Sequence, residues 1–170
     1  MKALLALAFL TMALNAFAKE SVLFVIRKDF HAKNVLYYTV KTEDGVLVDN
    51  SITTLWHMGE KGEGVVEPLA NNKEQQLAPT YIKGHAQEIE FSLEALKMFA
   101  DKLDSNSIIV RMEDDKPKAF VKIEGAEAEL TEIYLEMNTT AFGRIATGPK
   151  TMVLRGLVNG HPVHTPPLRP

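Results

Sequence analysis

The sequence predicts a mainly β (α+β) fold of about seven or eight antiparallel strands in a barrel-like or sandwich core, with one or two short helices. Three observations lead to this prediction. Short runs rich in β-branched and aromatic residues recur along the chain, turn-forming residues separate them, and helical periodicity is clear in one segment only. With 170 residues, 46% of them apolar, the chain has the size and composition of a folded soluble protein with one core.

The N-terminus has the pattern of a signal peptide. A basic start at Lys2 precedes an apolar run over residues 3–14, and residues 15–18 (NAFA) form a small-x-small cleavage site. We therefore expect residues 1–18 to be removed near Ala18 and the protein to be exported, as a periplasmic or secreted protein. No later apolar stretch approaches the length of a membrane span, so we expect no transmembrane span in the mature chain.

The mature chain shows no internal repeat, low-complexity linker or break in composition. We therefore expect a single β-rich domain over residues 19–158, followed by a Pro-rich C-terminal tail over residues 159–170. Four prolines in the last ten residues disfavour regular structure, so we expect the tail to lie across the surface or to hang free.

Charge and cysteine content exclude several classes of function. The formal net charge of −3 becomes −4 without Lys2, because 18 basic and 22 acidic residues remain. These basic residues are interspersed with acidic ones, which disfavours nucleic acid as a partner. The absence of Cys excludes disulfides and a thiolate nucleophile, and the sequence carries no cofactor fingerprint, so we expect no bound cofactor.

The first half of the mature chain is predicted to form strands. Ser21 to Ile26 is almost wholly apolar and too short for a typical helix, which indicates a buried strand. A second strand over Asn34 to Thr42 is followed by Asp44-Gly45, a pair that favours a tight hairpin turn. Ser51 to Met58 is predicted to form a further strand, which a Gly-rich acidic loop ends.

Two segments in the middle of the chain favour helices. Between Glu67 and Pro79, a proline suited to the first helical position predicts a short helix. From Ser92 to Asp104 the apolar residues fall on one helical stripe, and Ser92 is able to cap its start. A strand from Glu88 to Leu96 competes with this second helix, because Ile89, Phe91 and Leu93 also alternate.

The second half is predicted to be mostly β, in short, regularly spaced strands that imply antiparallel packing. Turn residues separate four such segments, which are Ser107 to Met112, Lys118 to Ile123, Ala128 to Met137 and Thr151 to Val158.

The order of these elements resembles an uncharacterised bacterial family, the domain of unknown function 4833. The matching features are Leu23 to Arg27, Asn34 to Tyr38, Leu55-Trp56 before a Gly/Glu loop, Glu67-Pro68-Leu69 with Leu77-Ala78, Glu129 to Leu135, and Met152 to Gly156. The resemblance spans nearly the whole mature chain. It implies export and a β-rich fold, and it implies no reaction.

Three arginines in predicted strands have two interpretations. Arg27, Arg111 and Arg155 lie within or at the end of apolar runs, where a guanidinium is costly unless it is paired or faces water. The favoured interpretation places them on the outer face of a one-sided sheet. Alternatively, two of them converge at a barrel mouth and hold an anionic ligand, which makes Arg27 and Arg111 candidate ligand-binding residues.

Trp56 and His57 are the other candidate ligand-binding residues. Because they are adjacent in a predicted strand, they point to opposite faces of the sheet. The favoured interpretation makes Trp56, the only tryptophan, a core anchor and leaves His57 facing solvent, whereas the alternative makes Trp56 a stacking surface for a ligand.

Three functional hypotheses remain open. The favoured one is an exported, non-enzymatic binding or envelope-associated module whose partner is an unknown small molecule, glycan, lipid or envelope protein. It is favoured because no catalytic constellation or metal site is recognisable in the sequence. The second is a periplasmic hydrolase whose site combines His57, His85 and nearby carboxylates. The third is metal carriage by His161 and His164, although Pro162 disfavours the helix that such a spacing needs.

Overall fold

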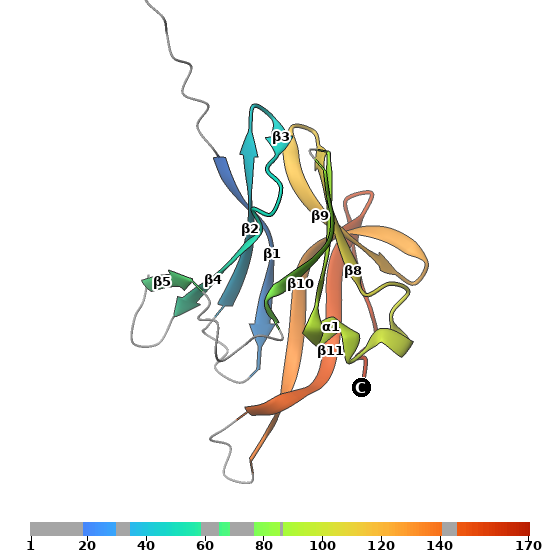
Figure 1. Ribbon diagram of the computed structural model, residues 1–170. Helices are drawn as coiled ribbons and strands as arrows, with labels where there is room; N and C mark the ends of the chain where they lie inside the picture. Colours follow the sequence, from blue (N-terminus) through green and yellow to red (C-terminus); the bar gives the residue numbers. More distant parts are fainter. Residues whose placement is uncertain (1–18, 30–34, 59–64, 69–76, 86, 141–145) are drawn as a thin grey trace, which may run out of the picture.

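The computed structural model describes residues 19–29, 35–58, 65–68, 77–85, 87–140 and 146–170. In this part of the chain twelve strands form one sheet, which curls into a half-barrel (Figure 1). The strands of its first half are β1 (Lys19–Lys28), β2 (Val35–Glu43), β3 (Val46–Leu47), β4 (Thr53–Met58), β5 (Val65–Pro68), β6 (Pro79–His85) and β7 (Glu88–Leu93). The remaining elements are α1 (Glu94–Lys97), η2 (Ala100–Lys102), β8 (Ser107–Glu113), β9 (Lys116–Ile123), β10 (Ala126–Thr139), β11 (Ala146–Val158) and β12 (His161–His164). The prediction of a mainly β fold is confirmed.

The strands follow the order β5-β4-β2-β1-β10-β9-β8-β7-β6, and β11 and β3 branch from β10 and β2. One neighbouring pair departs from the expected antiparallel packing, because β1 runs parallel to β10 from Val25 opposite Glu132 to Lys28 opposite Leu135. The 14-residue β10 explains this exception, since it pairs with β9 near its start and with β1 farther along. No tight hairpin joins β1 to β10, so their directions are not forced to be opposite.

The predicted hairpin after β2 is present. Asp44 and Gly45 have φ angles of 51° and 77°, the positive values that the two central residues of a type I′ turn require. The turn pairs Thr42 with Leu47 and Glu43 with Val46, and it leaves β3 only two residues long.

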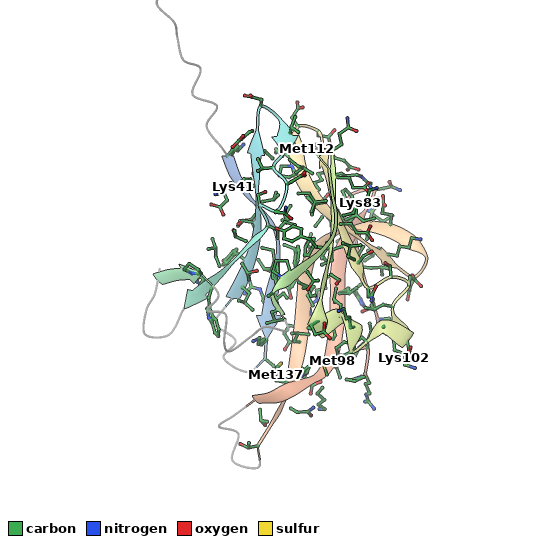
Figure 2. The ribbon with its side chains drawn as sticks, in the orientation of Figure 1. Lys41, Lys83, Met98, Lys102, Met112 and Met137 are labelled. Atoms are coloured by element: carbon green, nitrogen blue, oxygen red, sulfur yellow. The ribbon has the colours of Figure 1, made fainter. Side chains whose placement is uncertain are left out.

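One hydrophobic cluster fills the concave side of the sheet. The ring of Phe24 stacks on Tyr38 with centroids 4.4 Å apart and lies 6.4 Å from the ring of Phe91, so the core joins β1 and β2 to β7. Met112 and Met137 pack against this cluster at opposite ends of the molecule (Figure 2).

The segment from Glu88 to Asp104 is a strand followed by short helical turns, and the predicted helix begins two residues too early. Ile89, Phe91 and Leu93 are fully buried and alternate along β7, which pairs with β8, so the competing strand prediction is correct up to Leu93. Ser92 is buried in this strand and caps no helix. The helix prediction holds only in part beyond this point, because α1 has four residues and η2 has three, although Leu96 and Phe99 are buried in the core as the stripe predicted.

The segment predicted as a short helix from Glu67 to Pro79 begins and ends in strands. Pro68 is the last residue of β5 and Pro79 is the first residue of β6, while residues 69–76 lie outside the described part of the chain. The strand β6 was not predicted, because Pro79 and Gly84 conceal its alternation. Its Tyr81 pairs with Phe91 of the adjacent strand.

The Pro-rich tail lies against the sheet. A turn at Asn159 and Gly160 leads into β12, which pairs antiparallel with the end of β11. Farther along, Leu168 exchanges two backbone hydrogen bonds with Met152, at 2.8 and 3.0 Å. Of the two expectations for the tail, that of a segment lying across the surface holds.

Candidate ligand site on the inner face of the half-barrel

The strand β4 presents alternate side chains to the two faces of the sheet. Its pairing with β2 places Trp56 opposite Leu36 and Thr54 opposite Tyr38, both of which belong to the buried core. Thr54 and Trp56 therefore point to the inner, concave face. His57, one residue later, points to the outer face, as the alternation predicted.

Each of these two inner side chains buries a polar atom that has no hydrogen-bond partner. Oγ1 of Thr54 and Nε1 of Trp56 are the two side-chain atoms in this condition in the part of the chain that the structure describes. Thr54 is only 8% exposed, and Trp56 is partly buried against the core. A buried donor without a partner costs about 1–3 kcal/mol, so a folded protein retains such a group for a reason.

A cation lies near Trp56. Lys28, the last residue of β1, places its Nζ 5.7 Å from the centroid of the Trp56 ring. Its register opposite Leu135, which is 2% exposed, puts Lys28 on the same inner face as Ile26. The end of the half-barrel where β1 ends thus combines an ammonium group and an indole N–H with apolar neighbours, and the Thr54 hydroxyl lies farther along the same inner face.

The three arginines of the predicted strands lie on the outer face of the sheet, in accordance with the favoured interpretation. Glu132 binds two of them, with its carboxylate 3.5 Å from Nε of Arg27 and 2.6 Å from Nη1 of Arg155. The guanidinium of Arg155 also lies over the ring of Tyr134, 5.2 Å from its centroid. The structure therefore brings Arg27 and Arg155 together around a carboxylate of the chain itself.

Arg111 lies in a separate ion-pair cluster on the other half of the sheet. Its guanidinium covers the ring of Phe120 at 3.9 Å and donates hydrogen bonds to Glu127 and Glu113. The hydrogen bonds to Glu127 raise the pKa of Arg111 and lower that of Glu127. The carboxylates of Glu113 and Glu127 already pair with this guanidinium. Arg111 therefore belongs to the outer surface of the sheet and does not lie with Trp56 or Arg27.

His57 contacts an aromatic ring on the outer face. Its imidazole meets Tyr37 edge to face, with the ring centroids 6.0 Å apart. Its proposed partner in a hydrolase, His85, ends β6 opposite Glu88, and the side chain of His85 lies outside the described part, as do the acidic residues of the loop over 59–64.

His161 and His164 are both exposed on β12. Nδ1 of His164 lies 3.0 Å from the carbonyl oxygen of the adjacent Thr165. Within the described ranges, no group of three or more His, Cys, Asp or Glu side chains is arranged to hold a metal ion. No helix in these ranges is long and apolar enough to cross a membrane.

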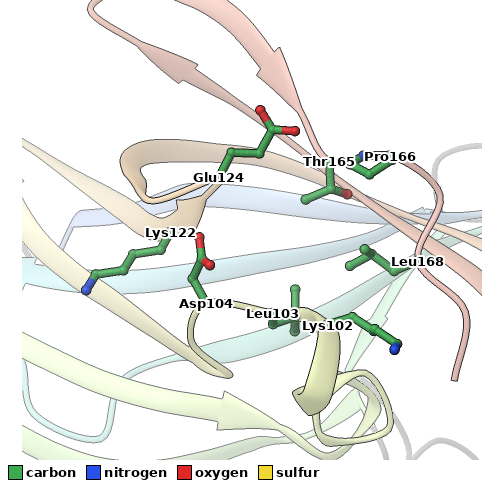
Figure 3. Close-up of a pocket in the computed structure, with 8 residues that line it drawn as sticks. All are labelled: Lys102, Leu103, Asp104, Lys122, Glu124, Thr165, Pro166 and Leu168. Atoms are coloured by element: carbon green, nitrogen blue, oxygen red, sulfur yellow. The ribbon is translucent and has the colours of Figure 1, made fainter.

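A small surface pocket of about 180 Å³ lies at the seam between the tail and the sheet (Figure 3). It is lined by Lys102, Leu103, Asp104, Lys122, Glu124, Thr165, Pro166 and Leu168. Its polar groups serve the fold, since Asp104 accepts a hydrogen bond from the amide of Gly125 and Thr165 accepts one from the amide of Leu154. This volume is below the usual size of a ligand site, about 300–1,000 Å³. The unpartnered atoms of Thr54 and Trp56 make the inner face of β4 the stronger candidate.

Sequence reasoning identified Trp56 but missed its neighbours Thr54 and Lys28. The two-residue spacing that places Thr54 on the face of Trp56 was visible in the sequence. The position of Lys28 was not, because its approach to Trp56 depends on the strand order β4-β2-β1.

Comparison with known proteins agrees with the resemblance noted in the sequence. A model of the domain of unknown function 4833 matches residues 24–152 of this chain. No curated protein and no solved structure matches it.

Proposed function

This chain belongs to the family of the domain of unknown function 4833, a description that names no activity. We therefore propose its function from the geometry of the chain itself. The protein is an exported, non-catalytic module that binds a small molecule on the inner face of β4. Export rests on the leader over residues 1–18, and N-terminal sequencing of the exported protein is expected to begin at Lys19. A start at Met1 in the exported protein would contradict cleavage.

The pair of unpartnered atoms on Thr54 and Trp56 carries this proposal. Both belong to the inner face of a curved sheet, the place where small β-barrels hold a ligand among side chains. A ligand with a hydrogen-bond acceptor would satisfy both atoms, and the cost of burying them would then be offset when the ligand binds.

A substitution that keeps the shape of Thr54 tests this explanation. Thr54→Val removes an unsatisfied hydroxyl, so we expect it to raise the free energy of unfolding by about 1–2 kcal/mol in urea titrations. Thr53→Val is the matched control, because Oγ1 of Thr53 lies 2.7 Å from that of Thr39 and donates to Glu20 on the outer face. The control is expected to lower stability or leave it unchanged. Destabilisation by Thr54→Val would mean that this hydroxyl is satisfied and would remove the basis of the proposal.

Binding is measured through Trp56, which is the only tryptophan and therefore reports on the site alone. We expect methyl octanoate, an apolar probe with neutral acceptor oxygens, to change the Trp56 emission saturably. Thr54→Val should weaken this binding by about tenfold, because one hydrogen bond is lost. Thr53→Val should leave it unchanged. An emission that does not saturate, or that responds equally in Thr54→Val, contradicts a binding site on this face.

A further inference from the structure

We propose that Arg27 and Arg155 form a binding site for a phosphate monoester with an apolar organic part, on the outer face of the sheet. This site lies on the opposite face from Thr54 and Trp56, so its test is independent of the proposed function.

The strand register brings the two arginines to one carboxylate. Glu132 of β10 lies opposite Arg155 of β11, and Arg27 of β1 lies opposite Tyr134, two residues farther along β10. The Glu132 carboxylate lies 3.5 Å from Nε of Arg27 and 2.6 Å from Nη1 of Arg155. Because this carboxylate contacts both guanidiniums, a further oxyanion of similar size is able to reach both from the solvent side.

Most hydrogen-bond donors of the two arginines remain available. A guanidinium carries five N–H groups, and one nitrogen of each arginine contacts Glu132. Within the described residues, the other nitrogens of Arg27 and Arg155 contact no second carboxylate. The two side chains are 47% and 49% exposed, against 18% for Glu132. The free donors are therefore accessible to a ligand from solvent.

The charge balance at this site is the opposite of that around Arg111. Two carboxylates, those of Glu113 and Glu127, pair with the single guanidinium of Arg111. Arg27 and Arg155 share one carboxylate, which leaves one excess positive charge. An anion from outside the chain would balance this charge.

The outer carboxylates that flank Glu132 along β10 do not cancel this excess charge. Glu129 lies 3.2 Å from Nζ of Lys118, and Glu136 lies 2.6 Å from Nζ of Lys150. Since each of them has its own lysine, an approaching anion meets the net positive charge of the two arginines at short range, where salt screens it least.

The presence of two guanidiniums favours a phosphate monoester over a carboxylate. Both anions pair with the planar fork of an arginine through two parallel hydrogen bonds. A carboxylate has two oxygens, which one fork occupies, whereas a phosphate monoester has three terminal oxygens and up to two negative charges. A phosphate monoester is therefore able to pair with Arg27 and Arg155 at once.

The surroundings of the arginines favour an apolar group on this phosphate. Val25 and Tyr37 continue the row of Glu132 across β1 and β2. Val153 of β11 lies opposite Tyr134 of β10. These four side chains are partly exposed on the outer face, where a one-sided sheet usually presents polar residues. An apolar ester group would cover this surface, and inorganic phosphate would not.

NMR titration with phenyl phosphate tests the site through the Nε–H signals of the arginines. We expect saturable shifts for Arg27 and Arg155 and none for Arg111, whose guanidinium already pairs with two carboxylates. Sodium chloride at equal ionic strength should not reproduce them. Inorganic phosphate should bind about tenfold more weakly, because it lacks the ring. Shifts that do not saturate, or that are equal at Arg111, would overturn the site. Equal affinity for phenyl phosphate and inorganic phosphate would overturn the apolar part.

Substitutions separate the site from general surface charge. Arg27→Gln and Arg155→Gln should each weaken phenyl phosphate binding by about tenfold. Arg155→Lys keeps the charge without the planar fork, and should weaken it by about threefold even if Arg155→Gln does not fold. Glu132→Gln should strengthen binding by about threefold, because it removes the negative charge between the arginines.

Lys41→Gln is the control for the loss of one positive charge, since Lys41 is exposed on β2 far from the arginines in the strand register (Figure 2). It should leave phenyl phosphate affinity unchanged. If Lys41→Gln weakens binding as much as Arg27→Gln, or if Glu132→Gln weakens it, the binding reflects overall charge and the assignment of the two arginines is wrong.

Sedimentation with phosphatidylcholine vesicles that contain phosphatidic acid distinguishes the two sources of such a monoester. Sedimentation that is lost in Arg27→Gln would assign the site to a lipid head group. Phenyl phosphate binding without sedimentation would assign it to a soluble phosphate ester. Sedimentation that Arg27→Gln retains would reflect general attraction to an anionic membrane and would overturn a lipid ligand at this site.

Discussion

The hydroxyl of Tyr81 binds both backbone polar groups of Ile52, accepting a hydrogen bond from the amide at 2.8 Å and donating one to the carbonyl oxygen at 3.2 Å. Tyr81 belongs to β6, the last strand in the order of the sheet, and Ile52 directly precedes β4 near the other end of that order. This side chain therefore connects the two ends of the curled sheet, and burial raises its pKa.

We expect Tyr81→Phe to lower the free energy of unfolding by about 1–3 kcal/mol, because two backbone groups of Ile52 lose their partner. Urea titration followed by circular dichroism measures the change. Tyr134→Phe is the control, since Tyr134 is partly exposed on the outer face and contacts Arg155 through its ring, which Phe retains. Equal stability of Tyr81→Phe and Tyr134→Phe would mean that water replaces the Tyr81 hydroxyl at Ile52.

A second prediction concerns the close approach of β11 to β10 at Gly156. A Cβ atom at this position would lie 2.5 Å from the carbonyl oxygen of Glu129, so a side chain forces the two strands apart. We expect Gly156→Ala to destabilise the protein by about 1–3 kcal/mol, as overpacking does in cores. In Gly84→Ala the added Cβ would meet Asp49 at an ordinary 3.6 Å, so this control should be nearly neutral in the same thermal or urea unfolding experiment.

A third prediction concerns the C-terminal tail. Thr165 and Leu168 exchange four hydrogen bonds with Leu154 and Met152 of β11, through three backbone pairs and the Thr165 hydroxyl. Removal of residues 165–170 should therefore lower stability by about 2–4 kcal/mol, at about 1 kcal/mol for each bond. Removal of residues 169–170 alone should have little effect. If both truncations leave the urea midpoint unchanged, the tail does not contribute to the stability of the sheet.

The sequence was sufficient to predict the strands whose burial alternates locally. Ser21 to Ile26 and Ser107 to Met112 are recognisable because β-branched residues recur in short runs between turns. The segment over 88–104 was harder to interpret, because Leu93 satisfies both the period of a strand and that of a helix. Its conformation is decided by pairing with β8, a long-range contact that local periodicity does not contain.

The candidate site depended even more on long-range contacts. Trp56 was identified because a lone tryptophan beside a glycine-rich loop stands out, but its neighbour Lys28 is 28 residues away in the chain. Alternation along β1 puts Lys28 on the face of the buried Ile26, whereas Arg27 turns outward to Glu132. The strand β2, which lies between β1 and β4, then brings Lys28 near Trp56. The alternation of side chains in a strand shows that Arg27 and Lys28 point to opposite faces. The arrangement of the strands in the sheet decides which of the two faces is the core.

The final prediction concerns acid stability and the Arg111–Glu127 pair. The hydrogen bonds from Arg111 hold the pKa of Glu127 below its ordinary value of about 4.5, so the folded protein favours the ionised carboxylate. The resulting stabilisation is fully present above this ordinary value and is lost as the pH falls through the lower pKa of the folded state. The free energy of unfolding of the native protein should therefore decrease on acidification below about pH 4.5.

Glu127→Gln isolates this contribution. The variant should be less stable than the native protein at pH 7, and the difference should shrink as the pH falls below about 4.5, because protonation then neutralises Glu127 in the native protein too. Glu136, whose pKa is lowered by Lys150 and Thr151, still titrates in the variant, so part of the acid sensitivity should remain. Asp101→Asn, a change at an exposed position in η2, is the control for removing one negative charge from the surface. A stability difference for Glu127→Gln that stays constant between pH 7 and pH 3 would mean that Arg111 contributes through its contact with Phe120 and not through its charge.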